Sequence, residues 1–144
     1  MNKKLLTIFL SLFLIGILSV SCSNEDKTAP KGIEQYNGNT YVSEDSFDAS
    51  SVKPDLKTAY LWVSIKDGQV ATFPNDNKTT APDFTGIYFT VTGSGTDYSF
   101  SINNNKVVGT LKFSADGSSV TLRYTANPDA PAEMLNTDIV CNKR

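Results

Sequence analysis

Apolar and polar residues alternate with a period of two over most of residues 39–141, and turn-forming residues interrupt this pattern every 8 to 14 positions. Successive side chains of a β-strand point to opposite faces of a sheet, so the pattern is typical of strands that bury one face. Helical periodicity is nearly absent from the same region. The predicted strands are residues 39–43, 59–65, 69–73, 85–92, 97–102, 107–113, 119–124 and 137–141. The alternation therefore predicts an all-β fold.

The segments between several of these strands have the composition of tight hairpin turns. Residues 66–68, 93–95, 103–105 and 115–117 are rich in Gly, Asn and Asp. These residue types tolerate the positive φ angles that short hairpin loops require. Because hairpins join strands that follow one another in the chain, the turns predict a small antiparallel meander.

The C-terminal half shows most clearly which side chains should point inward. The apolar rows are Tyr98, Phe100 and Ile102, then Val107, Gly109, Leu111 and Phe113, then Val120, Leu122 and Tyr124. With no helix long enough to cover this face, more sheet has to cover it, and about eight sequential strands can do so by closing into an up-and-down barrel. The bulk of these side chains favours a packed core. A two-sheet β-sandwich is the alternative fold.

The N-terminal segment has the three parts of an export signal: Lys3 and Lys4, an apolar-rich run, and small residues before Cys22. The run of roughly 16 residues is short for a transmembrane helix, which needs about 20. The stretch Leu18-Ser19-Val20-Ser21-Cys22 resembles the lipobox of bacterial lipoproteins, although its leucine lies four rather than the commoner three positions before the cysteine. This resemblance implies cleavage before Cys22, lipidation of Cys22 and anchoring in a membrane through the attached acyl chains.

The resulting predicted organisation is a signal peptide, expected to be helical, over residues 1–21, a flexible linker over 22–36 and a β-barrel domain over 37–144. The linker contains Pro30 and Gly32 and few apolar residues. Its Glu25-Asp26 pair resembles the acidic export tags of surface lipoproteins in gut-associated Gram-negative bacteria, and an ordinary solvated tether is the alternative. The expected location is the outer membrane, at the cell surface or the periplasmic face.

Charge and composition exclude several functional classes. Without residues 1–21 the chain has 11 basic and 15 acidic residues, a formal charge of −4, which argues against nucleic acid as a partner. The chain contains no histidine, and so lacks the usual general base and the commonest zinc ligand. With Cys22 lipidated, Cys141 has no disulfide partner and is expected to be a buried small hydrophobe in the last strand. No cofactor, metal or enzymatic activity is expected.

A second resemblance concerns the domain itself. Gly38-Asn39-Thr40-Tyr41 opens the first predicted strand, and a Gly-Thr-Leu-Lys-Phe-Ser-Ala-Asp-Gly stretch follows from Gly109 to Gly117. Together with the meander, these segments resemble the small lipocalin-like barrels of secreted bacterial lipoproteins. Lipocalins proper place a tryptophan where Tyr41 stands. The resemblance implies a barrel, with a short helical turn around Ser51-Val52-Lys53 capping one end.

Aromatic residues fall on the outward-facing positions of two predicted strands. In residues 59–65 the inward positions are Leu61, Val63 and Ile65, and in residues 85–92 they are Ile87, Phe89 and Val91. The alternation therefore predicts that Tyr60, Trp62 and Tyr88 form an exposed ligand-binding platform of the kind that stacks on sugar rings or anchors a protein. The alternative is a reversed register, or a cover formed by the linker or by residues 74–83.

Three pairs of acidic residues are candidates for catalytic carboxylates: Asp45 with Asp48, Asp76 with Asp83, and Asp129 with Glu133. All lie in predicted loops, where acidic residues usually form turns, and catalysis by any of them is not expected. Asp76 and Asp83 could also surround calcium, but the Asp-x-Asp-x-Asp-Gly pattern of a calcium loop is absent.

The preferred functional hypothesis is a non-enzymatic lipoprotein that binds a glycan, a peptide or a small apolar ligand at the aromatic platform or at the open barrel end. The alternative is a protein-interaction role, such as an enzyme inhibitor or immunity lipoprotein that acts through residues 74–83 or 127–136. The membrane, through Cys22, is an expected partner in both.

Overall fold

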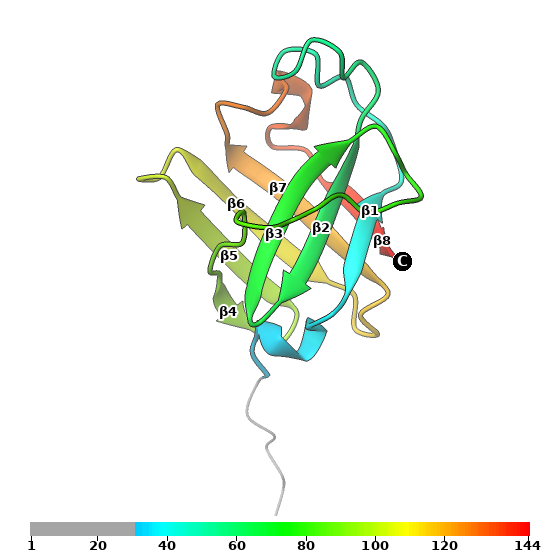
Figure 1. The fold of residues 1–144 in the computed structure, drawn as a ribbon. Coiled ribbons are helices and arrows are strands. Elements are labelled where there is room, and N and C mark those ends of the chain that lie inside the picture. Colours follow the sequence, from blue (N-terminus) through cyan, green and yellow to red (C-terminus); the bar gives the residue numbers. More distant parts are fainter. Residues whose placement is uncertain (1–30) are drawn as a thin grey trace, which may run out of the picture.

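The computed structural model describes residues 31–144. The predicted signal peptide (1–21), Cys22 and the first part of the predicted linker lie outside these residues. The elements are η1 (Ile33–Tyr36), β1 (Thr40–Ser43), β2 (Tyr60–Lys66), β3 (Gln69–Asn75), β4 (Thr92–Ser94), β5 (Asp97–Ile102), β6 (Val107–Phe113), β7 (Ser119–Ala126), η2 (Ala132–Met134) and β8 (Ile139–Lys143) (Figure 1). The predicted all-β fold is confirmed. Within the described range no helix is long and apolar enough to cross a membrane.

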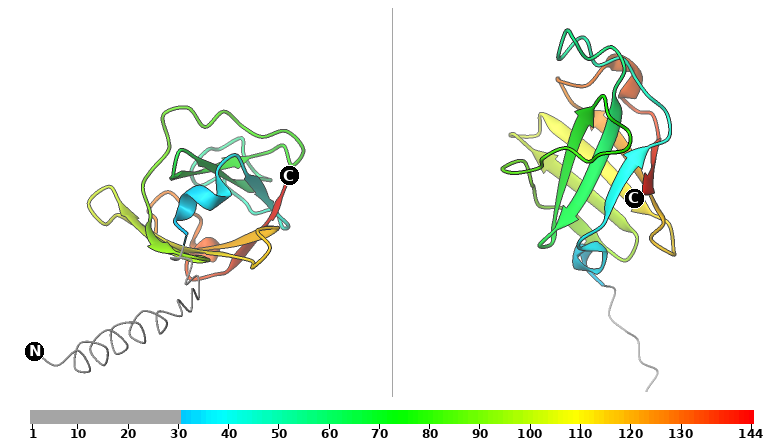
Figure 2. Two further views of the ribbon diagram at one scale, coloured as in Figure 1. Left: turned by 90° about the horizontal axis from the view of Figure 1, so that it is seen from below. Right: turned by 45° about the vertical axis from the view of Figure 1, so that its right-hand side comes forward.

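Residues 31–144 form one eight-stranded sheet with the strand order β3-β2-β1-β8-β7-β6-β5-β4. Every neighbouring pair is antiparallel, and β1 pairs with β8, so the first and last strands lie side by side. The sheet curls into a half-barrel, as the view from below shows (Figure 2). The predicted meander is confirmed, and the single sheet excludes the two-sheet sandwich as the alternative.

The half-barrel is open between β3 and β4. Across this seam the described residues form one isolated bridge, in which the Val70 N–H donates to the Phe89 carbonyl (2.9 Å) and the Phe89 N–H donates to the Val70 carbonyl (2.8 Å). The predicted strand over residues 85–92 is therefore wrong, because regular pairing begins only at β4. Phe89 and Val91 do pack against the main core, as expected, but Ile87 is 37% exposed.

A turn just before the bridge explains the missing strand. The Ile87 N–H donates to the Phe84 carbonyl, and Gly86 has a φ of +80°, which a residue with a side chain rarely adopts. This turn carries Phe84 away from the seam to the outer face of the sheet, where it packs against Trp62. In this segment Phe84 is buried against Trp62, and the continuous backbone pairing that the alternation predicted is not formed.

Backbone geometry confirms the hairpin turns predicted at residues 66–68, 103–105 and 115–117. The turn predicted at residues 93–95 lies instead at residues 95–96, because Gly93 and Ser94 belong to β4. Asp67 and Gly68 have φ angles of 51° and 72° and join β2 to β3 with Lys66 opposite Gln69. Asn103, Asn104 and Asn105 all have positive φ and join β5 to β6. These positions show why Asn, Asp and Gly were needed in the turns.

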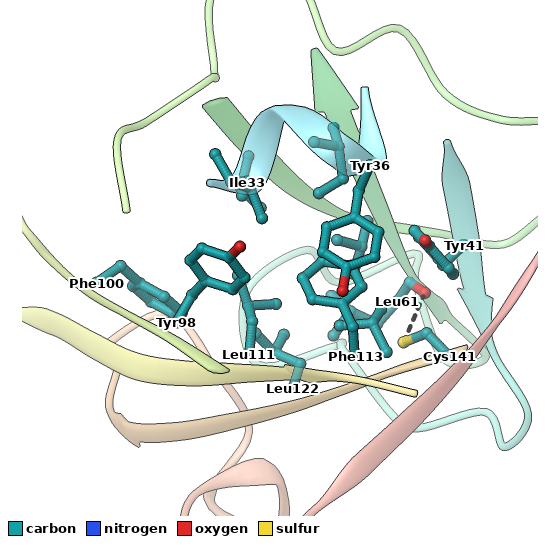
Figure 3. Packing of buried hydrophobic residues seen from close by; sticks show 14 of the residues in the cluster. Ile33, Tyr36, Tyr41, Leu61, Tyr98, Phe100, Leu111, Phe113, Leu122 and Cys141 are labelled. Carbon is teal, nitrogen blue, oxygen red and sulfur yellow. Dashed lines mark hydrogen bonds between the residues drawn. The ribbon is translucent and has the colours of Figure 1, made fainter. Parts of the chain in front are cut away.

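The main core lies on the concave side of the sheet (Figure 3). Its buried residues include the predicted inward positions Tyr98, Phe100, Leu111, Phe113, Val120, Leu122 and Tyr124, and also Leu61, Val63 and Ile65. The predicted inward face is therefore confirmed in both halves of the chain. These side chains form the packed core that the sequence predicts on this face of the sheet.

The short helix η1 closes that end of the barrel. Its Tyr36 ring stacks on Phe113 with 3.8 Å between centroids, and the Tyr36 hydroxyl donates to the Gly95 carbonyl at 3.1 Å. Ile33 is also buried. The prediction that a flexible linker extends to residue 36 is therefore wrong for residues 33–36, which belong to the folded domain. Two apolar side chains three positions apart on a helical turn supply the burial that a linker lacks.

Cys141 in β8 is fully buried, which confirms its predicted place in the last strand. Its Sγ lies 3.9 Å from the Leu61 carbonyl oxygen, a weak S–H···O contact (Figure 3). Burial raises the pKa of the Cys141 thiol to about 12. The side chain therefore behaves as a small apolar group at neutral pH.

Residues 45–59 cover the end of the barrel opposite η1. The Val52 and Lys53 N–H groups both donate to the Ala49 carbonyl, and the Leu56 N–H donates to the Lys53 carbonyl. The predicted helical turn at residues 51–53 is thus a series of hydrogen-bonded turns without a helix. Ala49 and Leu56 form a small buried cluster with Ala59 over this end.

Candidate functional site

The structure brings the three predicted platform residues together but does not leave them exposed. Tyr60, Trp62 and Tyr88 share a cluster on the outer face of the sheet, as the alternation predicted. Trp62, however, is only 1% exposed, and Tyr60 and Tyr88 are half-buried. The predicted exposed aromatic platform is therefore wrong.

Residues 77–88 form the cover over Trp62, and we refer to this segment as the strap. Phe84 of the strap packs on the Trp62 cluster, and the Trp62 Nε1–H donates to the Asn77 carbonyl at 2.8 Å. The hydroxyls of Tyr88 and Ser64 lie 3.0 Å apart. A cover by residues 74–83 is the alternative to exposure that the sequence predicts. Asn77 lies in that range, whereas Phe84 and Tyr88 follow it. The aromatic faces stabilise a second small core and are not free for a ligand.

Basic residues tie the same segment to the residues that follow β1 and β8. The Lys78 ammonium donates to the Glu44 carbonyl at 2.6 Å, and the Arg144 guanidinium donates to the Lys78 carbonyl at 3.3 Å. A depression of about 420 Å³ lies here, lined by Val42, Ser43, Glu44, Lys78, Asn142, Lys143 and Arg144. Since two of its cations are engaged in these contacts, we assign the depression a structural role.

A cavity of about 350 Å³ opens at the barrel end opposite η1. Strands β2, β3 and β7 form its sides, and the loops of residues 45–59 and 127–134 form its mouth, at the upper end in Figure 1. Its lining residues are Phe47, Ala49, Val52, Lys53, Leu56, Leu61, Thr72, Phe73, Pro74, Asn75, Asp76, Tyr124, Asn127, Asp129, Ala130, Pro131 and Met134. Most of these side chains are apolar, so the cavity is suited to an apolar ligand.

A hydrogen bond crosses the deep part of the cavity. The hydroxyls of Thr72 and Tyr124 lie 2.9 Å apart and join β3 to β7, which are not neighbours in the sheet. Tyr124 also packs edge-on against Phe100, with 6.0 Å between ring centroids. Burial raises the pKa of the Tyr124 phenol to about 12, and the hydrogen bond with Thr72 partly opposes the rise. The pair is therefore neutral at physiological pH, and each hydroxyl already has a partner.

The mouth of the cavity combines exposed apolar and charged side chains. Val52 and Phe73 are 48% and 42% exposed at this mouth. The charged lining residues are Lys53, Asp76 and Asp129. An apolar interior with a few polar groups at its mouth is a common arrangement in small-molecule sites.

Two of the acidic residues considered as catalytic candidates, Asp48 and Asp83, hold turns in their own loops. Asp83 accepts hydrogen bonds from the Thr85 hydroxyl and backbone N–H, and these bonds lower the pKa of its carboxyl. Asp48 likewise accepts from the Ser50 backbone N–H. Both act as turn formers, as loop acids usually do. Among residues 31–144 no three His, Cys, Asp or Glu side chains are grouped to hold a metal.

Sequence reasoning named the open barrel end as a binding place but missed the residues of the cavity. One signal was present in β3, where the inward row Val70, Thr72, Pro74 contains a polar residue and a proline. An inward hydroxyl needs a partner, and an inward proline interrupts regular pairing. The contribution of residues 127–134 left no such signal, because it depends on how the loops meet.

Comparisons with known proteins do not add to this picture: no family model matches the chain, and neither the curated proteins nor the solved structures gave a match. The cavity and the chemistry of its lining are therefore the basis for assigning a function.

Proposed function

We propose that this chain is a lipid-anchored binding protein whose cavity takes a small, largely apolar ligand. The observation that carries the proposal is the cavity at the barrel end opposite η1. Its volume of about 350 Å³ falls within the range of roughly 300–1,000 Å³ that is usual for ligand pockets. The lining is mainly apolar, and the hydroxyls of Thr72 and Tyr124 are hydrogen-bonded to each other. Both features favour burial of an apolar ligand.

The direction of the proposed anchor supports this role. Lys31 lies beside η1, where its carbonyl accepts hydrogen bonds from the Gly95 N–H (2.8 Å) and the Tyr98 hydroxyl (3.2 Å). Lys31 lies nine positions after Cys22, a distance of at most about 30 Å when extended. An anchor at Cys22 therefore approaches the closed end of the barrel. The mouth of the cavity lies at the end of the domain opposite this attachment, where the proposed ligand enters from the aqueous side.

Binding, rather than catalysis, is the function that the lining supports. The chain contains no histidine, and the phenol of Tyr124 is a poor proton donor or acceptor at neutral pH because of its raised pKa. The second predicted function, an inhibitor or immunity role exerted by the loops, stays a prediction.

The test is an NMR titration of the mature chain carrying Cys22→Ser with a panel of small apolar alcohols and aromatic molecules. We expect saturable shifts at Thr72, Tyr124 and Met134, and no shift at the Trp62 indole, which lies on the opposite face of the sheet. Ala130→Phe should fill the cavity and abolish binding, whereas Ala115→Phe in an exposed turn should not. Absence of saturable shifts, or equal binding by Ala130→Phe, would overturn the proposal.

A further inference from the structure

Charge is distributed unevenly between the two ends of the barrel. The loops of residues 45–59 and 127–137, with Asp76, carry six acidic and two basic side chains, a formal charge of −4. The other residues from 31 to 144 carry seven acidic and eight basic side chains, a formal charge of +1. All six acids at the cavity end are exposed: Asp45, Asp48, Asp55, Asp76, Asp129 and Glu133. The excess negative charge of the domain is therefore located around the mouth of the cavity.

Two of these carboxylates line the cavity directly. Asp76 follows β3 and Asp129 precedes η2, so acidic groups approach the mouth from both sides of the barrel. Within the described lining, Lys53 is the one basic side chain. Charges at a mouth above an apolar interior act on a bound head group over a distance of about one Debye length, roughly 8 Å at physiological salt.

We propose that the ligand is a cationic amphiphile, an apolar body that ends in an amine, and that the cavity discriminates against the corresponding carboxylate. This inference rests on the proposed function and specifies its ligand. The apolar body lies against Leu61, Met134 and the ring of Tyr124, and the amine remains at the mouth beside Asp76 and Asp129.

The deep end of the cavity explains this orientation. The hydroxyls of Thr72 and Tyr124 are paired with each other, so an apolar tail that reaches them leaves no polar group without a partner. An amine placed there would lose its hydration without gaining a carboxylate, since the acids lie at the mouth. Head-out binding is therefore the favoured arrangement.

The experiment compares three ligands with the same ten-carbon chain: decylamine, decanol and decanoate. Each is titrated by calorimetry, below its micelle concentration, into the mature chain carrying Cys22→Ser. We expect decylamine to bind most tightly and decanoate most weakly, with about a tenfold or larger difference between these two. The difference should shrink when the salt concentration rises from about 50 to about 500 mM, because screening weakens the rim charges.

Charge-neutralising variants separate the head-group contact from the cavity. Asp76→Asn with Asp129→Asn should bring decylamine close to decanol in affinity and leave the affinity for decanol unchanged. Asp67→Asn is the matched control, because it removes a carboxylate at the β2–β3 turn near η1. It should preserve the preference for the amine.

The outcomes distinguish the two proposals. If none of the three ligands binds, the proposed function fails and the present inference fails with it. If decanol and decanoate bind as tightly as decylamine, or if the Asp76 and Asp129 substitutions leave the preference intact, the cavity is a binding site and the assignment of a cationic ligand is overturned.

Discussion

The hydroxyl of Thr72 on β3 lies 2.9 Å from the hydroxyl of Tyr124 on β7 and links two strands that are not neighbours in the sheet. The bond spans the interior of the half-barrel close to its open seam. It therefore ties the free edge formed by β3 to β7, and both of its residues line the cavity.

Removing one partner of this bond should destabilise the domain. Tyr124→Phe leaves the Thr72 hydroxyl without its partner, and we expect the free energy of unfolding to fall by about 1–2 kcal/mol. Urea denaturation of the wild type, Tyr124→Phe, Thr72→Val and the double variant would measure this change in the free energy of unfolding. The free energy of unfolding should fall by less in the double variant than the sum of the losses in the two single variants. Additive losses would show that the two hydroxyls are not coupled.

The strap should determine the environment of the single tryptophan. In the native protein we expect Trp62 to have blue-shifted emission and low sensitivity to acrylamide, since it is buried and bonded to Asn77. Phe84→Ala should raise the quenching constant and lower stability by about 3 kcal/mol, because it removes a buried aromatic ring. Ile87→Ala, in the same segment but exposed, is the control. Strong acrylamide quenching of Trp62 in the wild type would contradict the burial of this residue under the strap.

Alkaline pH should destabilise the domain through buried groups that bind protons tightly. Burial raises the pKa of Cys141 from 9.0 to about 12, so from about pH 9 upward the unfolded chain loses this proton while the folded chain keeps it. The contribution is fully present below pH 9 and is lost as the pH rises toward 12, by about 1.4 kcal/mol per pH unit for this group.

Urea denaturation at pH 8, 9.5 and 10.5 would measure this loss. Cys141→Ala should reduce the slope without removing it, because the pKa of Tyr124 is also raised, from 10.0 to about 12. An equal slope in Cys141→Ala and in the wild type would show that the thiol does not contribute. The native thiol should also resist thiol reagents at pH 8 and react only after unfolding.

Gly109 in β6 should not tolerate a side chain. A Cβ atom there would lie 2.5 Å from the Arg123 carbonyl oxygen and 2.5 Å from the ring of Phe100. Gly109→Ala therefore requires the backbone of β7 to move, and we expect a loss of about 1–3 kcal/mol in thermal or urea denaturation. Thr110→Ala, at the next and exposed position, should change stability by less than about 0.5 kcal/mol. Comparable effects of the two substitutions would contradict the close approach.

Local patterns were sufficient for most of the strands. The predicted residues 97–102 and 107–113 coincide with β5 and β6, and the other confirmed strands differ at their ends by at most two residues. Both signals act over a few residues: alternation determines which side chains share a face, and Gly, Asn or Asp permits the turn. The strand predicted at residues 85–92 failed because its pairing with β3 competes with the burial of Phe84 on Trp62.

Trp62 shows which structural properties local patterns predict and which they do not. Alternation determined that its side chain lies on the face opposite Leu61, Val63 and Ile65, and the structure agrees. Whether that face is exposed was decided by Asn77 and Phe84, which fold back over it from later in the chain. The cavity likewise depends on the meeting of residues 45–59 and 127–134. Periodicity is a property of neighbouring residues and can be read along the chain, whereas burial and enclosure depend on contacts between distant segments, which only the tertiary structure decides.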